Sequence, residues 1–556
     1  MKKFRLIYRS ILYYKFDNML LWLGILLSTA ILTSALIIGD SVTYNLLKQV
    51  DYRLGKTTHA VIGQEKYMPA SFAKTLAAEL NTSVAPVLLL KGIAGSDQTT
   101  ERISGINVIG VDSAFEKLSI GKFPTMKPDE AIVNLELATK LKLQVGDEIV
   151  IRMEKANQIS LNVPFVSTEN NTITLRLRIS EIIDKENFGN FNIETNQKNP
   201  YSVFLSIEKL SLLSFKSVMA NVMLIESAQL SPEDISKSIQ HGWELAHINL
   251  KIRTANQQLE LVSDEVFLPD TLLAALKNNY KTQPQPQLTY LVNSLQNKHL
   301  ETPYSFVSGI ETYPAFELAD HEIAINTWLA SDLQAKLNDT IQLKYYSLQS
   351  FRKLVEDSMS LVVKKIIPIT GFAADSLLMP AFDGLKNVDR CSDWKAGIPV
   401  DFKKIRQKDE DWWKKHKGTP KAFVSYNFAK TKWGNAFGNA TSVRFDQNTD
   451  SAAIASTILN GITPESVGLM AFDIRNDARW SATNAVDFTQ LFLALSFFLI
   501  VAAFLLSGLL WGIVLNRRKH EQGIMLATGI AQKHIFSVFL AEGIFIAFLG
   551  SVAGVI

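Results

Sequence analysis

Residues 488–515 read FTQLFLALSFFLIVAAFLLSGLLWGIVL, and this uncharged run determines how the rest of the chain is interpreted. A basic turn follows it, and then comes a second apolar run in which Glu542 is the one acid. A helix rises about 1.5 Å per residue, so roughly 20 apolar residues cross the hydrocarbon core of a bilayer. The sequence therefore predicts a membrane protein with spans at 488–516 and 535–556.

The N-terminus predicts one more span. Residues 1–17 combine basic side chains with an apolar stripe at helical spacing. This pattern is typical of an amphipathic helix in the inner headgroup layer, with a disordered basic leader as the alternative. Met19–Gly39 is uncharged and longer than the apolar core of a cleaved signal peptide, so we expect an uncleaved anchor over 18–39.

Basic residues set the predicted topology. Those at 1–17 place the N-terminus in the cytoplasm, and those at 517–519 place the loop 517–534 on the same side. Between the first two spans, residues 40–487 contain no apolar run of spanning length, which predicts a large extracytoplasmic region. Cys391 in this region is expected to react with a membrane-impermeant thiol reagent applied from outside.

Composition excludes some classes of function. The 556 residues carry a net charge of +3 without a basic stripe, so no nucleic-acid partner is expected. A single cysteine allows no intramolecular disulfide and no cysteine-built metal site. The chain has no phosphate-binding loop, no HExxH and no GxSxG, so we expect no catalytic, cofactor or metal residues.

The extracytoplasmic region contains an internal repeat. Glu130–Arg152 reads EAIVNLELATKLKLQVGDEIVIR, and Glu322–Lys344 reads EIAINTWLASDLQAKLNDTIQLK, at an offset of 192 residues. Each copy predicts a short strand, a helix with one apolar face, a turn and a second strand. We infer two related α/β lobes over about 55–240 and 250–445, with chance similarity of two strand–helix–strand segments as the alternative.

Further elements are predicted around this repeat. Leu175–Ile183 and Ile366–Phe372 are expected to form the next strand of each copy, and Ser451–Arg479 shows a helical stripe. Thr282–Gln287 has the composition of a linker. Asp383–Phe445 is rich in Trp, Lys and Asp; its tryptophans are expected to pack a loop-rich subdomain with solvated charges, and carbohydrate or headgroup contact is the alternative.

Two features of the C-terminal runs concern helix packing. Small residues four apart let helix backbones approach closely in lipid, and both runs have such a pair: Gly508, Gly512, Gly550 and Gly554. Glu542 is costly within a span unless it contacts protein or water. It either packs into a helix bundle or extends to the nearby cytoplasmic edge, and the sequence leaves both open.

The turn and the last run resemble the permease core of FtsX/MacB-type ABC transporters. The resemblance lies in a basic pair, an acid, an apolar-Gly segment, an Ala-x-Gly and an intramembrane Glu-Gly, carried here by Arg517, Arg518, Glu521, Gly523, Ala527, Gly529, Glu542 and Gly543. Leu526 stands where many members have an arginine. The outer repeat, with Val108–Asp112 ahead of its first copy, looks like the MacB periplasmic core.

The resemblance implies an α+β membrane protein that acts as a permease subunit in a bacterial inner membrane. ATP would be bound by a separate cytoplasmic subunit, which would dock on a coupling loop made of Arg517, Arg518, Glu521, Gly523, Ala527 and Gly529. It also implies a dimer of permease subunits whose outer lobes move to export or extract an unknown substrate. Because the family has further membrane helices, the sequence is expected to be C-terminally truncated.

Two other functions stay open. A non-transporting signal transmitter that activates an envelope enzyme, such as a cell-wall hydrolase, would use the same ATPase and differ in the partner of the outer lobes. An anchored adhesion or receptor ectodomain would need one span and no patterned cytoplasmic turn.

Overall fold

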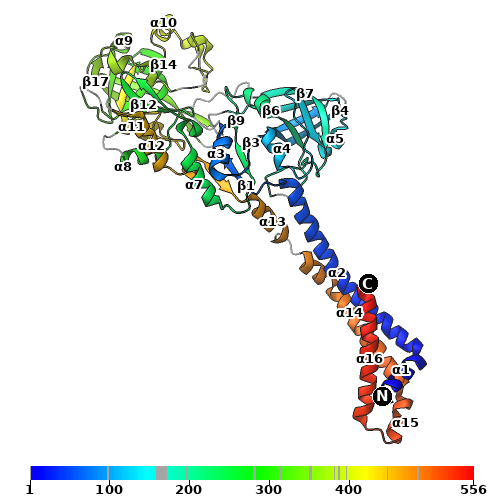
Figure 1. Ribbon diagram of the computed structural model, residues 1–556. Coiled ribbons are helices and arrows are strands. Elements are labelled where there is room, and N and C mark those ends of the chain that lie inside the picture. The colour runs from blue at the N-terminus through cyan, green and yellow to red at the C-terminus, as the bar shows by residue number, and fades with distance from the viewer. Residues whose placement is uncertain are drawn as a thin grey trace. The chain divides into compact units, whose positions relative to one another are not determined.

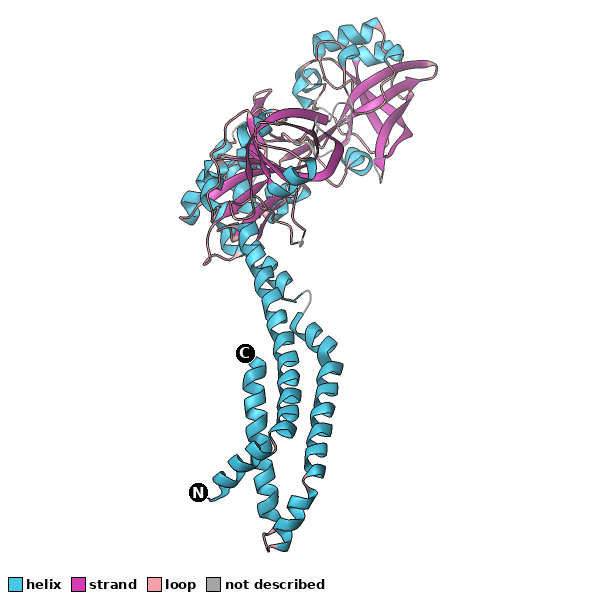
Figure 2. Ribbon diagram, turned by 90° about the vertical axis from the view of Figure 1, so that its right-hand side faces the viewer, coloured by secondary structure: helices cyan, strands magenta, loops and turns pink. Residues whose placement is uncertain are grey.

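The computed structural model in Figure 1 divides the chain into two compact units, Met1–Tyr52 with Arg475–Ile556, and Arg53–Ile474. It describes residues 2–64, 66–96, 99–157, 172–195, 198–279, 284–312, 316–349, 353–380, 382, 384–385, 388–395, 397–446, 449–484 and 488–556. In these ranges the first unit is helical, and the second contains all of the strands (Figure 2). The mixed α and β composition that the sequence predicts is confirmed.

The helical unit contains long apolar helices joined to short ones. Among the residues that the structure describes, three segments are long and apolar enough to cross a membrane: Lys15–Leu54, Ala494–Arg517 and Gln532–Val555. The predicted span 18–39 is part of the first, a continuous helix of 40 residues that is about 60 Å long. The helices are α1 (Lys2–Tyr13), α2 (Lys15–Leu54), α13 (Ile474–Asn484), α14 (Phe488–Arg517), α15 (Lys519–Ala527) and α16 (Gln532–Val555).

The first lobe of the second unit is a nine-stranded sheet in the order β20-β1-β10-β3-β4-β8-β5-β7-β6. Because β6 also pairs with β3, six of these strands close into a barrel. The strands are β1 (His59–Gly63), β3 (Val84–Ser96), β4 (Thr99–Val111), β5 (Glu130–Asn134), β6 (Glu148–Glu154), β7 (Thr172–Ile183), β8 (Ser202–Ser206), β10 (Val222–Ile225) and β20 (Leu469–Phe472), with a separate pair β2 (Met68–Pro69) and β9 (Met219–Ala220). The helices are α3 (Phe72–Leu80), α4 (Ser113–Leu118), α5 (Leu135–Leu141), α6 (Ile207–Leu212) and α7 (Pro232–Gly242).

The second lobe repeats this arrangement, in the order β11-β12-β19-β13-β14-β18-β15-β17-β16, and β16 closes a barrel by pairing with β13. The strands are β11 (Leu250–Ala255), β12 (Gln258–Ser263), β13 (Gln285–Asn297), β14 (Leu300–Ile310), β15 (Glu322–Asn326), β16 (Thr340–Gln349), β17 (Lys353–Ile367), β18 (Ala422–Ser425) and β19 (Ser442–Arg444). The helices are α8 (Asp270–Asn279), α9 (Thr327–Asp332), α10 (Gln407–His416), α11 (Tyr426–Trp433) and α12 (Ser451–Gly461).

Local details show that the two lobes are copies of one fold. The parallel pairing of β5 with β7 is interrupted between Ala131 and Ile132. That of β15 with β17 is interrupted 192 residues later, between Ile323 and Ala324. Asn134 and Asn326 are both buried N-caps that accept a hydrogen bond from the backbone N–H three residues on. The two related lobes expected from the repeat are confirmed.

Three predicted elements around the repeat were wrong in part. The strand predicted at Ile366–Phe372 ends at Ile367, because Pro368 has no N–H to donate to a ladder. The predicted linker Thr282–Gln287 is in β13 from Gln285, and its residues 282 and 283 lie outside the described residues. The helical stripe Ser451–Arg479 is interrupted by β20, which completes the sheet of the first lobe.

Candidate functional site

The short helix α15 joins the ends of two long helices, and much of its surface is solvent-exposed. Ile524 and Leu526 leave 65% and 52% of their surface exposed, on opposite flanks of the helix because they are two residues apart. After the helix, Gly529 adopts a left-handed conformation (φ +84°) that favours glycine, and the chain turns into α16. The predicted loop 517–534 is therefore largely helical, with two large apolar side chains exposed.

The predicted loop residues divide into two groups. Gly523, Ala527 and Gly529 are exposed, and Arg517 is an exposed arginine that donates to Asp17 of α2 at 2.7 Å. Arg518, its neighbour, is only 2% exposed. Two adjacent arginines thus have opposite environments, one at the surface and one buried among the helices.

Arg518 uses all three of its nitrogens in hydrogen bonds to different helices. Nε donates to Glu521 of α15 at 2.9 Å, and Nη1 donates to Glu542 of α16 at 2.9 Å. Nη2 donates to the hydroxyl of Ser10 in α1 at 2.5 Å. The guanidinium carbon also lies 4.3 Å from the ring centroids of Tyr14 and Phe539, a distance typical of cation–π contacts.

Glu542 is packed inside the helix bundle and is 1% exposed. Besides Arg518, it accepts hydrogen bonds from Ser10 Oγ at 3.0 Å and from Asn18 Nδ2 at 3.2 Å. Removing a carboxylate from water costs several kcal/mol, and close donors with an opposite charge offset this cost. The structure therefore supports packing of Glu542 inside the helix bundle and not its extension to the cytoplasmic edge.

The residues Ser10, Tyr14, Asn18, Arg518, Glu521 and Glu542 form what we call the arginine hub. Sequence reasoning missed the first three of these. Their signal was a polar stripe at intervals of four residues, one helical turn each. The backbone keeps this register where α1 meets α2, because Tyr14 N donates to Ser10 O and Asn18 N donates to Tyr14 O, both at 3.0 Å.

The four predicted packing glycines also divide into two groups. A Cβ at Gly550 would lie 3.0 Å from Ile25 Cγ2, and a Cβ at Gly554 would lie 2.6 Å from the carbonyl oxygen of Leu26, so both glycines face α2 closely. A Cβ at Gly508 or Gly512 of α14 would meet nothing within 4 Å among the described residues. The packing role of this second pair stays a prediction.

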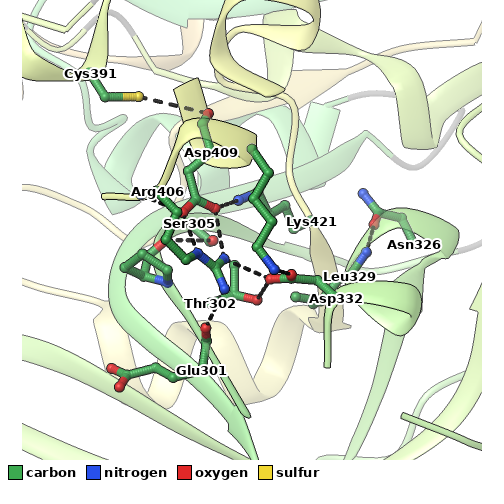
Figure 3. Close-up of polar contacts among 12 residues, drawn as sticks. Glu301, Thr302, Ser305, Asn326, Leu329, Asp332, Cys391, Arg406, Asp409 and Lys421 are labelled. Atoms are coloured by element: carbon green, nitrogen blue, oxygen red, sulfur yellow. Dashed lines mark hydrogen bonds and ion pairs between the residues drawn. The ribbon is translucent and has the colours of Figure 1, made fainter. Parts of the chain in front are cut away.

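A second buried group of charges lies in the second lobe (Figure 3). Arg406 donates to Asp332 and to Asp409, both at 2.7 Å. Lys421 Nζ lies 3.6 Å from Asp409 Oδ1 and 4.2 Å from the ring centroid of Trp328. Burial lowers the pKa of Lys421 to about 8. These contacts join α9, α10 and the start of β18, so they tie the long connection between β17 and β18 to the lobe.

This connection corrects two expectations. Trp394, Trp412 and Trp413 are buried, so the predicted packing role of the tryptophans holds for them, but the charges of Lys421 and Asp409 are buried and not solvated. Cys391 is also buried, with its Sγ 3.9 Å from the carbonyl oxygen of Asp409, and burial raises the pKa of its thiol to about 12. The structure therefore contradicts the expected reaction of Cys391 with an external thiol reagent.

In the ranges that the structure describes, no group of three or more His, Cys, Asp or Glu side chains is arranged to hold a metal ion. The arginine hub consists of groups that pair with one another and with α1, α2, α15 and α16. Such an arrangement can hold helices together and transmit their movement.

Comparisons with known proteins give two family matches. Residues 493–556 match the family model for the FtsX-like permease C-terminal domain, and residues 19–241 match that for the MacB-like periplasmic core domain. The second match ends before the second lobe, which the structure shows to be another copy of the first. The FtsX and MacB resemblance of the sequence is thus confirmed.

Comparisons with individual proteins give weaker information than the family models. A crystal structure of the periplasmic region of MacB from Actinobacillus actinomycetemcomitans matches 34% of this chain and 86% of that chain, with 7% identity and a TM-score of 0.24. The family models, and not this likeness, carry the assignment. A comparison with curated proteins found no match.

Proposed function

We propose that this chain, which belongs to the FtsX/MacB-type ABC transporter permeases, couples ATP hydrolysis by a separate cytoplasmic subunit to movement of its outer lobes. The chain is a membrane protein with a large periplasmic domain. The ATP-binding subunit would dock on α15, and the moving lobes would export or extract a substrate that the chain itself does not identify.

The observation that carries this proposal is the two-sided environment of α15. One side is fixed to the helical unit, because Arg518 just before the helix and Glu521 within it belong to the arginine hub. The other side exposes Gly523 and Ala527, with Ile524 and Leu526 at its two edges, although burying large apolar side chains is favourable. A helix that is held from one side and apolar on the other is suited to receive a protein partner.

The proposed topology follows from the charges. The basic residues of 1–17 and of 517–519 would lie in the cytoplasm, with the predicted spans 18–39, 488–516 and 535–556 in a bacterial inner membrane. Two copies of the chain would form the permease, and Gly508 and Gly512 of α14 face open space where such a copy could pack. The bilayer and the ATP-binding subunit are the further partners.

Co-purification tests the docking proposal. The tagged full-length protein would be isolated from its native membrane in mild detergent, as wild type, as Ile524→Asp and as Leu337→Asp. We expect an ATP-binding subunit to accompany the wild type and Leu337→Asp, since Leu337 is a comparably exposed apolar residue (56%) in the second lobe. Ile524→Asp should lose the subunit because a charge is placed on the docking face. Recovery of all three proteins without an ATPase would overturn the proposal.

A signal transmitter would use the same docking site for its ATPase, so the co-purification experiment gives the same result for it as for a transporter. The two functions differ in what the outer lobes bind, and proteins cross-linked to the lobes would separate them. A cell-wall hydrolase among those partners would favour the signal transmitter. If the chain is an anchored receptor, no ATPase should co-purify with it.

A further inference from the structure

The arginine hub connects α15 to a part of the chain that lies some 500 residues earlier. Arg518 Nη2 donates directly to Ser10 at 2.5 Å, and Tyr14 lies against the guanidinium. A second route passes through Glu542, which accepts from both Arg518 and Asn18. The N-terminal helices α1 and α2 are therefore tied to the base of α15 twice, through one partly buried hydrogen bond and through the buried hydrogen bonds of Glu542.

An arginine suits this junction better than a lysine. Its planar guanidinium presents donors in a rigid fork, so one side chain can hold three groups in fixed directions while its faces stack on aromatic rings. Here the fork meets Glu521, Glu542 and Ser10. A lysine would keep the charge, but a single ammonium on a flexible chain would not hold the three helices in one geometry.

Helix α2 leads away from this junction without a break. It runs from Lys15 to Leu54, and near its far end Asp51 pairs with Arg475 of α13 at 2.7 Å and with Arg479 at 3.3 Å. Its first turn belongs to the hub through Asn18. A displacement at the hub would therefore act on the helix that precedes the first lobe in the chain.

We propose that Arg518 is a positioning residue that ties the ATPase-docking helix to α1 and α2, so that movement of α15 is passed to α2 as well as to α14 and α16. On this account the basic N-terminal helix α1 is part of the coupling apparatus and not only a membrane anchor. The inference rests on the proposed function, because it assigns the path along which the docked ATPase acts.

The test measures movement of α2 separately from ATPase binding. Spin labels would be placed at Tyr44→Cys on α2 and Leu505→Cys on α14, both exposed, in the full-length chain with its ATP-binding subunit. The buried Cys391 would stay unlabelled. The distance between the labels would be measured by pulsed EPR with and without ATP, in wild type, Arg518→Lys and Arg9→Lys.

We expect ATP to change this distance in the wild type and in Arg9→Lys, where an exposed arginine of α1 is replaced without disturbing the hub. In Arg518→Lys the ATPase should still co-purify, but the ATP-dependent change should fall at least twofold. Asn18→Leu, which removes one hydrogen bond to Glu542 and spares Arg518, should lower the change by a smaller factor. This variant keeps the test informative if Arg518→Lys fails to fold.

The possible failures are distinguishable. An unchanged ATP-dependent shift in Arg518→Lys and Asn18→Leu, with the ATPase still bound, would overturn this inference alone. Loss of the ATPase from folded Arg518→Lys would make Arg518 a docking residue and overturn its positioning role. Absence of an ATPase from the wild type would overturn the proposed function, and this inference with it.

Discussion

Arg518 and Glu542 form a buried ion pair, with Nη1 of the arginine 2.9 Å from Oε2 of the glutamate and both side chains at most 2% exposed. The two residues are 24 positions apart: Arg518 lies between α14 and α15, and Glu542 lies in α16. A buried pair of this kind contributes little net stability, but breaking it leaves an uncompensated charge. The pair matters for the proposed function because it lies at the base of α15, the proposed docking helix.

Removing one partner of this pair should therefore cost more than removing both. We expect Glu542→Leu to lower the free energy of unfolding by up to about 3–5 kcal/mol, because the buried Arg518 then keeps only Glu521 as a carboxylate partner. The double variant Arg518→Met with Glu542→Leu should recover most of this loss. Thermal unfolding in detergent would measure both, and equal losses in the single and double variants would contradict the coupling.

The glycines of the last two helices should respond differently to alanine. Gly554→Ala should lower the melting temperature, because the new Cβ would lie 2.6 Å from a backbone oxygen of α2. Gly512→Ala meets nothing within 4 Å and should be neutral or stabilising by up to about 1 kcal/mol in the purified chain, since alanine favours helix. Thermal unfolding of the two variants in parallel is the check. A similar drop in melting temperature in both variants would show that Gly512 also packs closely against another helix.

Lys421 should give the second lobe a characteristic pH dependence. Burial lowers its pKa to about 8, whereas an unfolded lysine titrates near 10.4. Between these values the unfolded chain binds one more proton than the folded chain, so the free energy of unfolding rises with pH; below about pH 8 the full penalty of burying the charge remains. From pH 7.5 to 10, the free energy of unfolding of the wild type should rise by roughly 2–3 kcal/mol relative to that of Lys421→Met. Parallel pH curves for the two proteins would contradict this.

Thiol labelling can test the topology, although the native cysteine is unsuited to it. The buried Cys391 should stay unlabelled in the folded protein, and Leu337→Cys in the exposed turn before β16 should react from outside the cell. A cysteine at Thr528, exposed at the end of α15, should react only after the inner membrane is opened. Labelling of position 528 from outside would invert the proposed topology.

Sequence reasoning succeeded where the signal is local. Membrane helices follow from uncharged runs of sufficient length, and the two lobes follow from a repeat whose strand, N-cap and turn residues are close together in the chain. Asn134 and Asn326 illustrate this, since each caps the helix that directly follows it.

Contacts between distant segments could not be predicted in the same way. Ser10 and Asn18 meet Glu542 only because three helices pack together, and no periodicity relates residues more than 500 positions apart. Strand β20 likewise joins the sheet of the first lobe from beyond the second lobe. The polar stripe at 10, 14 and 18 was visible, but its partner was not.

Photo-crosslinking at Ile524 tests the central claim most directly. A photoreactive amino acid would replace Ile524 on the exposed face of α15 in the full-length chain, with Leu337 of the second lobe as the matched exposed position. Irradiation of intact cells and identification of the captured proteins by mass spectrometry should give an ATP-binding subunit at position 524 and not at 337. A chain that captures no ATP-binding protein at 524, although it is expressed and inserted normally, would contradict the account.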